Sequence, residues 1–116
     1  MATATRKLEE AALPALVKLK AAALEEFSGV RSLHYSLGED FFGNPAITVL
    51  AVLEDSFLAE AKKLGRTRVD FSDFIRLTLA NEFGEADVWI QPYVRLISIK
   101  DFERMDAARA NAWKSI

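Results

Sequence analysis

The chain has 116 residues, 51% hydrophobic and 28% charged, which predicts a single globular domain over residues 1–116 with a sizeable core. It has no cysteine, which excludes disulfides, thiolate metal sites and thiol catalysis, and fits a cytoplasmic location. Its net charge of −2 gives no global cationic field for nucleic acid or anionic lipid. We find no apolar stretch long enough for a secretory signal or a membrane span, so no membrane partner is expected.

The first expected element is a helix over residues 5–27, where apolar residues recur at spacings of three and four. Pro14 lies inside this range and predicts either a kink or a helix that begins near residue 14. A second apolar row widens the apolar face beyond what one small sheet covers. We therefore expect either burial inside the monomer or helix-to-helix contact with another copy of the chain. This row consists of Leu13, Val17 and Leu24.

A β-hairpin is expected next. Residues 30–37 alternate between apolar and polar side chains, which predicts a half-buried strand. Residues 46–53 are apolar on both faces, which predicts a central strand that is covered on both sides. The intervening segment GEDFFGNP is short enough for a hairpin, and Gly43 and Asn44 are typical turn residues. We therefore expect the two strands to pair antiparallel.

Phe41 and Phe42 lie in that connecting segment and have two interpretations. Adjacent residues in an extended loop point apart, so at most one ring folds back onto the core with ease. If the rings are exposed, they are candidate anchors for a protein partner. The alternative is that both rings cover the open end of a small sheet.

The remaining elements are two helices, a strand and a final helix, expected near residues 56–64, 71–83, 87–99 and 102–114. Pro92 has no N–H to give to a sheet, so the third strand should lie at a sheet edge or contain a bulge. The order α-β-β-α-α-β-α predicts an α+β fold. We expect a two-layer sandwich in which the helices pack on a three-stranded sheet.

The polar residues provide no catalytic signature. The only histidine, His34, lies on the polar face of the first strand without a second histidine or a cysteine to complete a site. The acidic pairs Glu39–Asp40 and Glu54–Asp55 lie at opposite ends of the hairpin, about 25 Å apart at the usual strand rise. No serine elbow or phosphate-binding loop occurs. We therefore predict no catalytic residue, no metal ligand and no cofactor.

A basic segment between the second and third helices is the candidate for binding nucleic acid. Its charges could hold phosphates, or they could belong to a solvated helix end. The element order also resembles the bacterial-type (type II) KH fold, whose helix–GXXG–helix loop grips single-stranded RNA. Here the loop is Gly65-Arg66-Thr67-Arg68, which lacks the second glycine. The resemblance implies an RNA-binding module that uses Lys62, Lys63, Arg66 and Arg68.

A second resemblance covers about half of the chain. The hairpin and the third strand look like those of small uncharacterised bacterial α+β proteins, which have a GxDxxGxPA hairpin and a PYVR strand. The resemblance implies a small accessory component of a toxin–antitoxin or defence operon and no established activity. The matching residues are Gly38, Asp40, Gly43, Pro45 and Ala46, then Pro92, Tyr93, Val94 and Arg95.

Together these features favour a non-enzymatic domain that binds a protein partner or a second copy of itself. The expected contact residues are Phe41 and Phe42 together with Leu13, Val17 and Leu24 of the first helix. RNA binding through the basic segment is the alternative.

Overall fold

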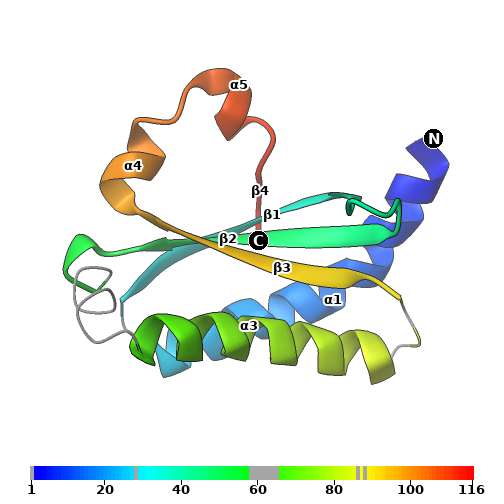
Figure 1. Cartoon of the computed structure of the whole chain (residues 1–116), viewed down its shortest axis with the longest axis horizontal. Helices are drawn as coiled ribbons and strands as arrows, with labels where there is room; N and C mark the ends of the chain where they lie inside the picture. The colour runs from blue at the N-terminus through cyan, green and yellow to red at the C-terminus, as the bar shows by residue number, and fades with distance from the viewer. Residues whose placement is uncertain (1, 28, 58–65, 86, 88) are drawn as a thin grey trace.

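The computed structural model of the chain describes residues 2–27, 29–57, 66–85, 87 and 89–116 (Figure 1). Two long helices and a twisted sheet dominate it, and short helices follow near the C-terminus. The elements are α1 (Ala2–Glu26), β1 (Val30–Glu39), β2 (Pro45–Leu53), α3 (Arg66–Glu85), β3 (Gln91–Ser98), α4 (Ile99–Glu103), α5 (Ala107–Ala110) and β4 (Lys114–Ser115).

The sheet has four strands in the order β3-β2-β1-β4, so the prediction of a three-stranded sheet is wrong. β1 and β2 pair antiparallel along their whole length, as the hairpin pattern predicts. β2 and β3 pair parallel, from Ala46 opposite Gln91 to Leu53 opposite Ser98. The strand that the sequence did not indicate is β4, which pairs antiparallel with His34 and Tyr35 of β1.

The fourth strand exists because the C-terminal segment does not form one helix over 102–114. Ser98 caps α4 by accepting the backbone N–H of Asp101, and α4 ends at Glu103. Asp106 then starts a new short helix by accepting the backbone N–H of Arg109. The chain leaves α5 and crosses to β1, where the backbone N–H of Ile116 donates to the carbonyl of Leu33 at 3.1 Å.

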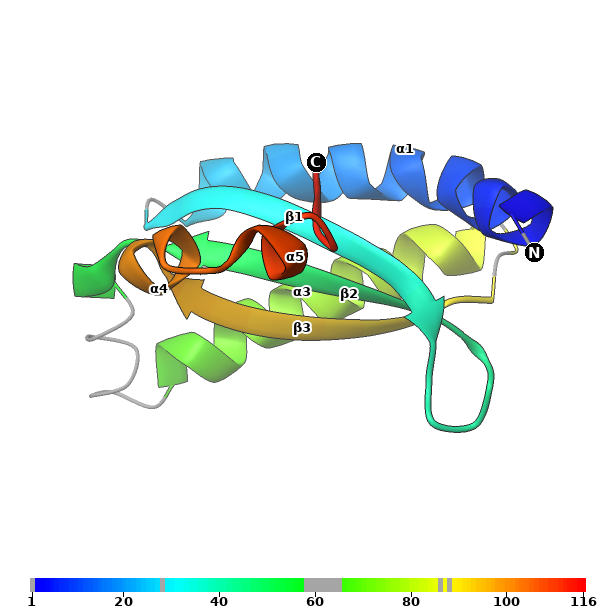
Figure 2. The ribbon, with the colours of Figure 1, turned by 90° about the horizontal axis from the view of Figure 1, so that it is seen from above.

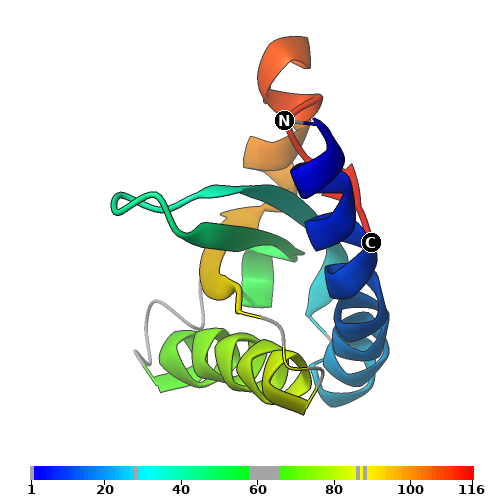
Figure 3. The same cartoon turned by 90° about the vertical axis from the view of Figure 1, so that its right-hand side faces the viewer.

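The helices cover the sheet on both faces, so the predicted two-layer sandwich is also wrong (Figures 1 and 3). α1 and α3 lie side by side on one face, and Lys18 of α1 donates to Glu82 of α3 at 3.1 Å. α4 and α5 lie over the opposite face. The main core forms between the sheet and the α1–α3 layer. Its members include Leu16, Leu19, Leu33, Ile47, Val49, Leu53, Phe71, Ile75, Leu79 and Phe83.

Pro92 and Pro14 both have structural consequences. β3 is an edge strand, so Pro92 lies at a sheet edge, one of the two placements that the sequence predicted. Pro14 lies inside α1, which runs from Ala2 to Glu26, so the alternative of a helix that begins near residue 14 is wrong. The helix predicted over 56–64 falls largely outside the described residues. Among the residues that the structure describes, no helix is long and apolar enough to cross a membrane.

Candidate functional site

The hairpin tip between β1 and β2, residues 40–44, is held by the side chain of Asp40. One carboxylate oxygen, Oδ1, accepts the backbone N–H groups of Phe42 and Asn44, both at 2.9 Å. The backbone N–H of Asp40 donates to the Asn44 carbonyl at 2.9 Å, and the N–H of Gly43 donates to the Asp40 carbonyl at 3.0 Å. Gly43 has φ +80°, which a residue without a Cβ adopts at little cost. The tip is therefore closed by its own hydrogen bonds.

The two aromatic rings on this tip face solvent. Phe41 is 96% exposed and Phe42 is 82% exposed. The rings touch each other edge to face, with centroids 5.5 Å apart. They do not cover the open end of the sheet, so that interpretation of the pair is wrong. The tip displays an aromatic pair while its backbone is already ordered.

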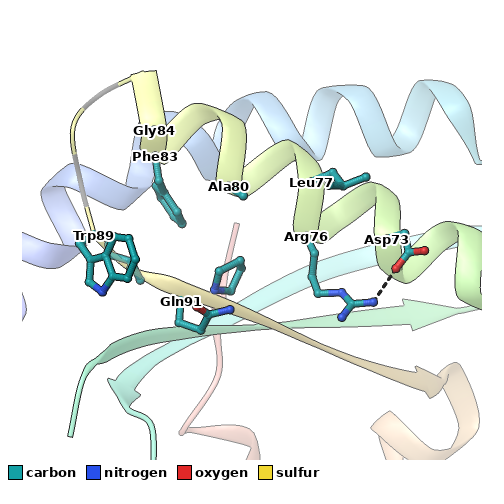
Figure 4. A pocket seen from close by; sticks show the side chains of 10 residues that line it. Asp73, Arg76, Leu77, Ala80, Phe83, Gly84, Trp89 and Gln91 are labelled. Atoms are coloured by element: carbon teal, nitrogen blue, oxygen red, sulfur yellow. Dashed lines mark hydrogen bonds and ion pairs between the residues drawn. The ribbon is translucent and has the colours of Figure 1, made fainter. Parts of the chain in front are cut away.

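A groove lies beside the tip, between α3 and the edge strand β3 (Figure 4). Its volume is about 550 Å³. Leu77 and Trp89 are 69% and 79% exposed, whereas Phe83 is buried. Among the described residues, the only charged side chains that line it belong to Asp73 and Arg76, which form an ion pair. The lining residues are Asp73, Arg76, Leu77, Ala80, Phe83, Gly84, Trp89, Ile90, Gln91 and Pro92.

The sequence of α3 explains why a groove forms there. Leu77, Ala80 and Gly84 follow one another at spacings of three and four, so they share one helix face. The small side chains of Ala80 and Gly84 leave space between the helix and β3. Because β3 is the last strand on this side of the sheet, one edge of its backbone is unpaired among the described residues. The groove is an apolar trough with hydrogen-bonding groups along one wall.

The tip and the groove lie on the same side of the molecule. Seen from above, the hairpin extends past the start of β3, on the side of the sheet away from α1 (Figure 2). The end-on view shows the tip projecting at the level of the sheet beyond its β3 edge, with α1 on the opposite side (Figure 3). We call residues 39–42 together with the α3–β3 groove the β3-side surface.

Sequence reasoning identified the tip and missed the groove. The spacing of Phe71, Ile75 and Leu79 assigns them to one inward face of α3, and all three are buried. With that assignment, Leu77 is a large apolar residue outside the inward face. This residue was the signal in the sequence for an apolar surface on α3. Trp89 was placed inside a strand expected over 87–99, but β3 begins only at Gln91. Trp89 instead precedes the strand and stands free beside the groove.

The apolar row on α1 is also exposed. Leu13, Val17 and Leu24 are on the surface, with Val17 at 62% exposure, so the alternative of burial inside the monomer is wrong. This row lies on α1, on the opposite side of the molecule from the projecting tip in the end-on view (Figure 3). No cavity described in the structure is lined by these three residues. The row therefore offers a flat apolar strip rather than a shaped site.

His34 has a structural environment. Its ring stacks on Phe102 of α4 with centroids 4.7 Å apart, and its Nε2 lies 3.0 Å from the Ser32 hydroxyl. Burial lowers the pKa of His34 below its usual value of 6.5, and the positive charge of Lys20 lowers it further. The ring thus joins the sheet to α4 in its neutral form, without a carboxylate partner among the described residues.

The acidic pairs lie apart, as the hairpin geometry predicts. Glu39 is opposite Pro45 at the tip, whereas the backbone N–H of Glu54 donates to the Gly29 carbonyl at the other end of the hairpin. Within the described part of the chain, no group of three or more metal-ligating side chains comes together.

A second cavity of about 550 Å³ lies between the sheet and the C-terminal segment. Arg95 and Arg109 line it, and neither forms an ion pair with the residues that the structure describes. Its other lining residues are Leu50, Leu96, Ile97, Met105, Ala112 and Trp113. No carboxylate or imidazole lines this cavity, so its described lining contains no acid–base pair.

The basic segment cannot be assessed in the same way. Lys62 and Lys63 lie outside the described residues. Arg66 and Arg68 form part of the first turn of α3, and their side chains lie outside the described part of the structure. RNA binding through these four residues stays a prediction from the sequence.

Comparison with protein-family models, with curated proteins and with solved structures finds no match to this chain. Neither resemblance noted from the sequence is tested by these comparisons. The function is therefore inferred from the geometry of the chain itself.

Proposed function

We propose that the chain is a protein-binding domain that engages its partner through the β3-side surface. The observation that carries this proposal is the exposure of Phe41 and Phe42 on a tip whose backbone is fixed by Asp40. Two adjacent aromatic rings in water are unfavourable, since each buries roughly 150–250 Å² when it finds a partner.

The arrangement has the features of a binding hot spot. Aromatic anchors dominate the energetics of protein interfaces and cluster beside apolar pockets. Here the tip projects beyond the β3 edge of the sheet (Figure 2), and exposed Trp89 and Leu77 line the groove between β3 and α3 (Figure 4). Because the tip is ordered before binding, less conformational entropy is lost when the partner arrives. This preorganisation supports binding rather than a loop that orders only on contact.

Photo-crosslinking from the tip tests the proposal. Phe42→p-benzoylphenylalanine places a photoreactive aromatic ring at the exposed position, and Lys100→p-benzoylphenylalanine on α4 is the matched exposed control. After irradiation in cells of the source organism, we expect a covalent protein adduct at position 42 that is absent at position 100. Equal labelling at both positions, or no adduct at position 42, would contradict the proposal.

The same proposal includes a cellular location and a biological setting for the chain. The absence of cysteine supports a reducing, cytoplasmic setting. The loose resemblance of the hairpin and of the PYVR strand to bacterial proteins supports an accessory role in a toxin–antitoxin or defence operon. The identity of the crosslinked partner would test both the cytoplasmic location and the accessory role.

A further inference from the structure

We propose, building on the protein-binding function above, that the partner of the β3-side surface is a second copy of this chain. The hairpin tip of each copy inserts into the α3–β3 groove of the other. Each copy thus supplies both an aromatic projection and an apolar trough, and the pair closes on itself.

The size of the groove fits the projection. A cavity of about 150 Å³ accommodates one benzene ring. The groove, at about 550 Å³, therefore has room for both phenyl rings of the tip. Its exposed apolar members, Leu77 and Trp89, are the groups that gain a partner when the rings enter.

The charges fit as well. The tip carries acidic Glu39 and Asp40 immediately before its aromatic pair. The groove presents the guanidinium of Arg76, which has five N–H donors and gives Asp73 a single hydrogen bond. Among the described residues Arg76 pairs with Asp73 alone, so its other N–H groups can bind the exposed Glu39 carboxylate of the arriving tip. Glu39 and Asp73 would then share the Arg76 guanidinium, and the chain's own hairpin supplies both this carboxylate and the aromatic pair.

The placement of the two features satisfies the geometry of a closed dimer. A two-fold interface requires one surface to be complementary to itself, with the projection and the receiving groove on the same side. The tip projects beyond the β3 edge of the sheet (Figures 2 and 3), and the α3–β3 groove is lined by residues of that edge strand. In the monomer the tip leaves its own groove unfilled, since Phe41 is 96% exposed and Trp89 is 79% exposed.

Sedimentation equilibrium with complementary variants tests this arrangement. The tip variant is Phe41→Ser/Phe42→Ser, and the groove variant is Leu77→Glu, which places a negative charge where the acidic tip would enter. Val17→Glu on α1 is the matched control, because Val17 is 62% exposed and Leu77 is 69% exposed, each on a long helix. These positions are exposed, so each variant is expected to keep the fold, which circular dichroism checks.

We expect the wild type and Val17→Glu to dimerise equally. The tip and groove variants should each dimerise at least about tenfold more weakly, because each change removes both tip-in-groove contacts of the dimer. A mixture of the two variants should associate more strongly than either alone. In the mixed pair the intact tip of the groove variant meets the intact groove of the tip variant, which restores one contact.

A chain that stays monomeric up to about 1 mM, the weak limit of specific binding, would overturn the inference. Dimerisation that survives both variants, or a mixture without recovery, would overturn it too. Crosslinking at position 42 separates this failure from failure of the proposed function. An adduct with a different protein, on a monomeric chain, removes the second copy as partner and keeps the protein-binding function. If no adduct forms at position 42, both the second copy as partner and the protein-binding function are contradicted.

Discussion

The carboxylate of Asp40 accepts the backbone N–H of Phe42 at 2.9 Å, yet the ring of Phe42 is 82% exposed. The fold thus fixes the backbone of the tip while leaving its apolar side chain in water. A residue that serves only packing would have its ring buried. The relationship is that of an anchor that is oriented before its partner arrives.

Replacement of Asp40 tests whether its side chain orders the backbone of the tip while the Phe41 and Phe42 rings stay exposed. Asp40→Ala removes the acceptor for two backbone N–H groups, so residues 41–43 should become mobile on the nanosecond scale and association should weaken. Asp40→Asn keeps an acceptor oxygen and should preserve both properties. The measurement is ¹⁵N relaxation of the tip amides. Unchanged order parameters in Asp40→Ala would show that the side chain does not fix the tip.

Gly43→Ala should destabilise the protein by about 1–2 kcal/mol, because φ +80° is costly for a residue with a Cβ. No atom would obstruct the new methyl group, so the cost comes from the backbone alone. Gly38→Ala is the control, since its site is equally open and its φ is not positive. Urea denaturation measures both variants. Equal free energies of unfolding for the two would contradict this account of the turn.

Stability should depend on pH through His34. Its pKa in the folded state is lowered from 6.5, so the unfolded chain binds the proton first as the pH falls. The free energy of unfolding should therefore be highest above pH 6.5 and should decrease as the pH falls from 6.5 through the lowered pKa. His34→Gln, which does not titrate there, should lose this dependence. Denaturation between about pH 5 and 8, the range in which histidine ordinarily titrates, gives the comparison. Identical slopes would contradict it.

Truncation of a core aromatic residue should lower stability strongly, whereas truncation of a groove aromatic residue should leave stability almost unchanged. Phe71 is fully buried against Phe27, with ring centroids 4.8 Å apart, so Phe71→Ala should cost about 3–5 kcal/mol. Trp89 is 79% exposed, so Trp89→Ala should change stability by only about 0.5 kcal/mol or less. The same Trp89 variant should weaken self-association. Thermal denaturation and sedimentation together check this. A large loss of stability in Trp89→Ala would show that Trp89 is a core residue.

The sequence predicts the hairpin and the edge strand because both have local causes. The period of two in the strands, the turn at Gly43 and the missing N–H of Pro92 each act on residues close to them in the sequence. β4 has no such cause. Lys114 and Ser115 are polar, and they form a strand only because β1 offers an unpaired edge after the chain turns at Asp106. Tertiary pairing therefore decided the fourth strand.

The candidate site also has one part that the sequence indicates, the tip, and one part that it does not, the groove. Phe41 and Phe42 are conspicuous in sequence because two aromatic residues adjoin a turn. The groove depends on how α3 lies against β3, and a one-dimensional pattern does not contain that distance. Leu77 could be identified as an apolar residue off the inward face, but its neighbour Trp89 belongs to a different segment of the chain. Only the fold brings the two together.

The most direct test of the central claim is an isotope-filtered NOE experiment on a mixture of labelled and unlabelled chains. It detects only contacts between protons of different copies. We predict intermolecular NOEs from the rings of Phe41 and Phe42 to the Leu77 methyl groups and the Trp89 indole. NOEs that join only the Leu13, Val17 and Leu24 row of one copy to its counterpart would contradict the claim. So would a dimer that shows no contact to the Phe41 or Phe42 ring.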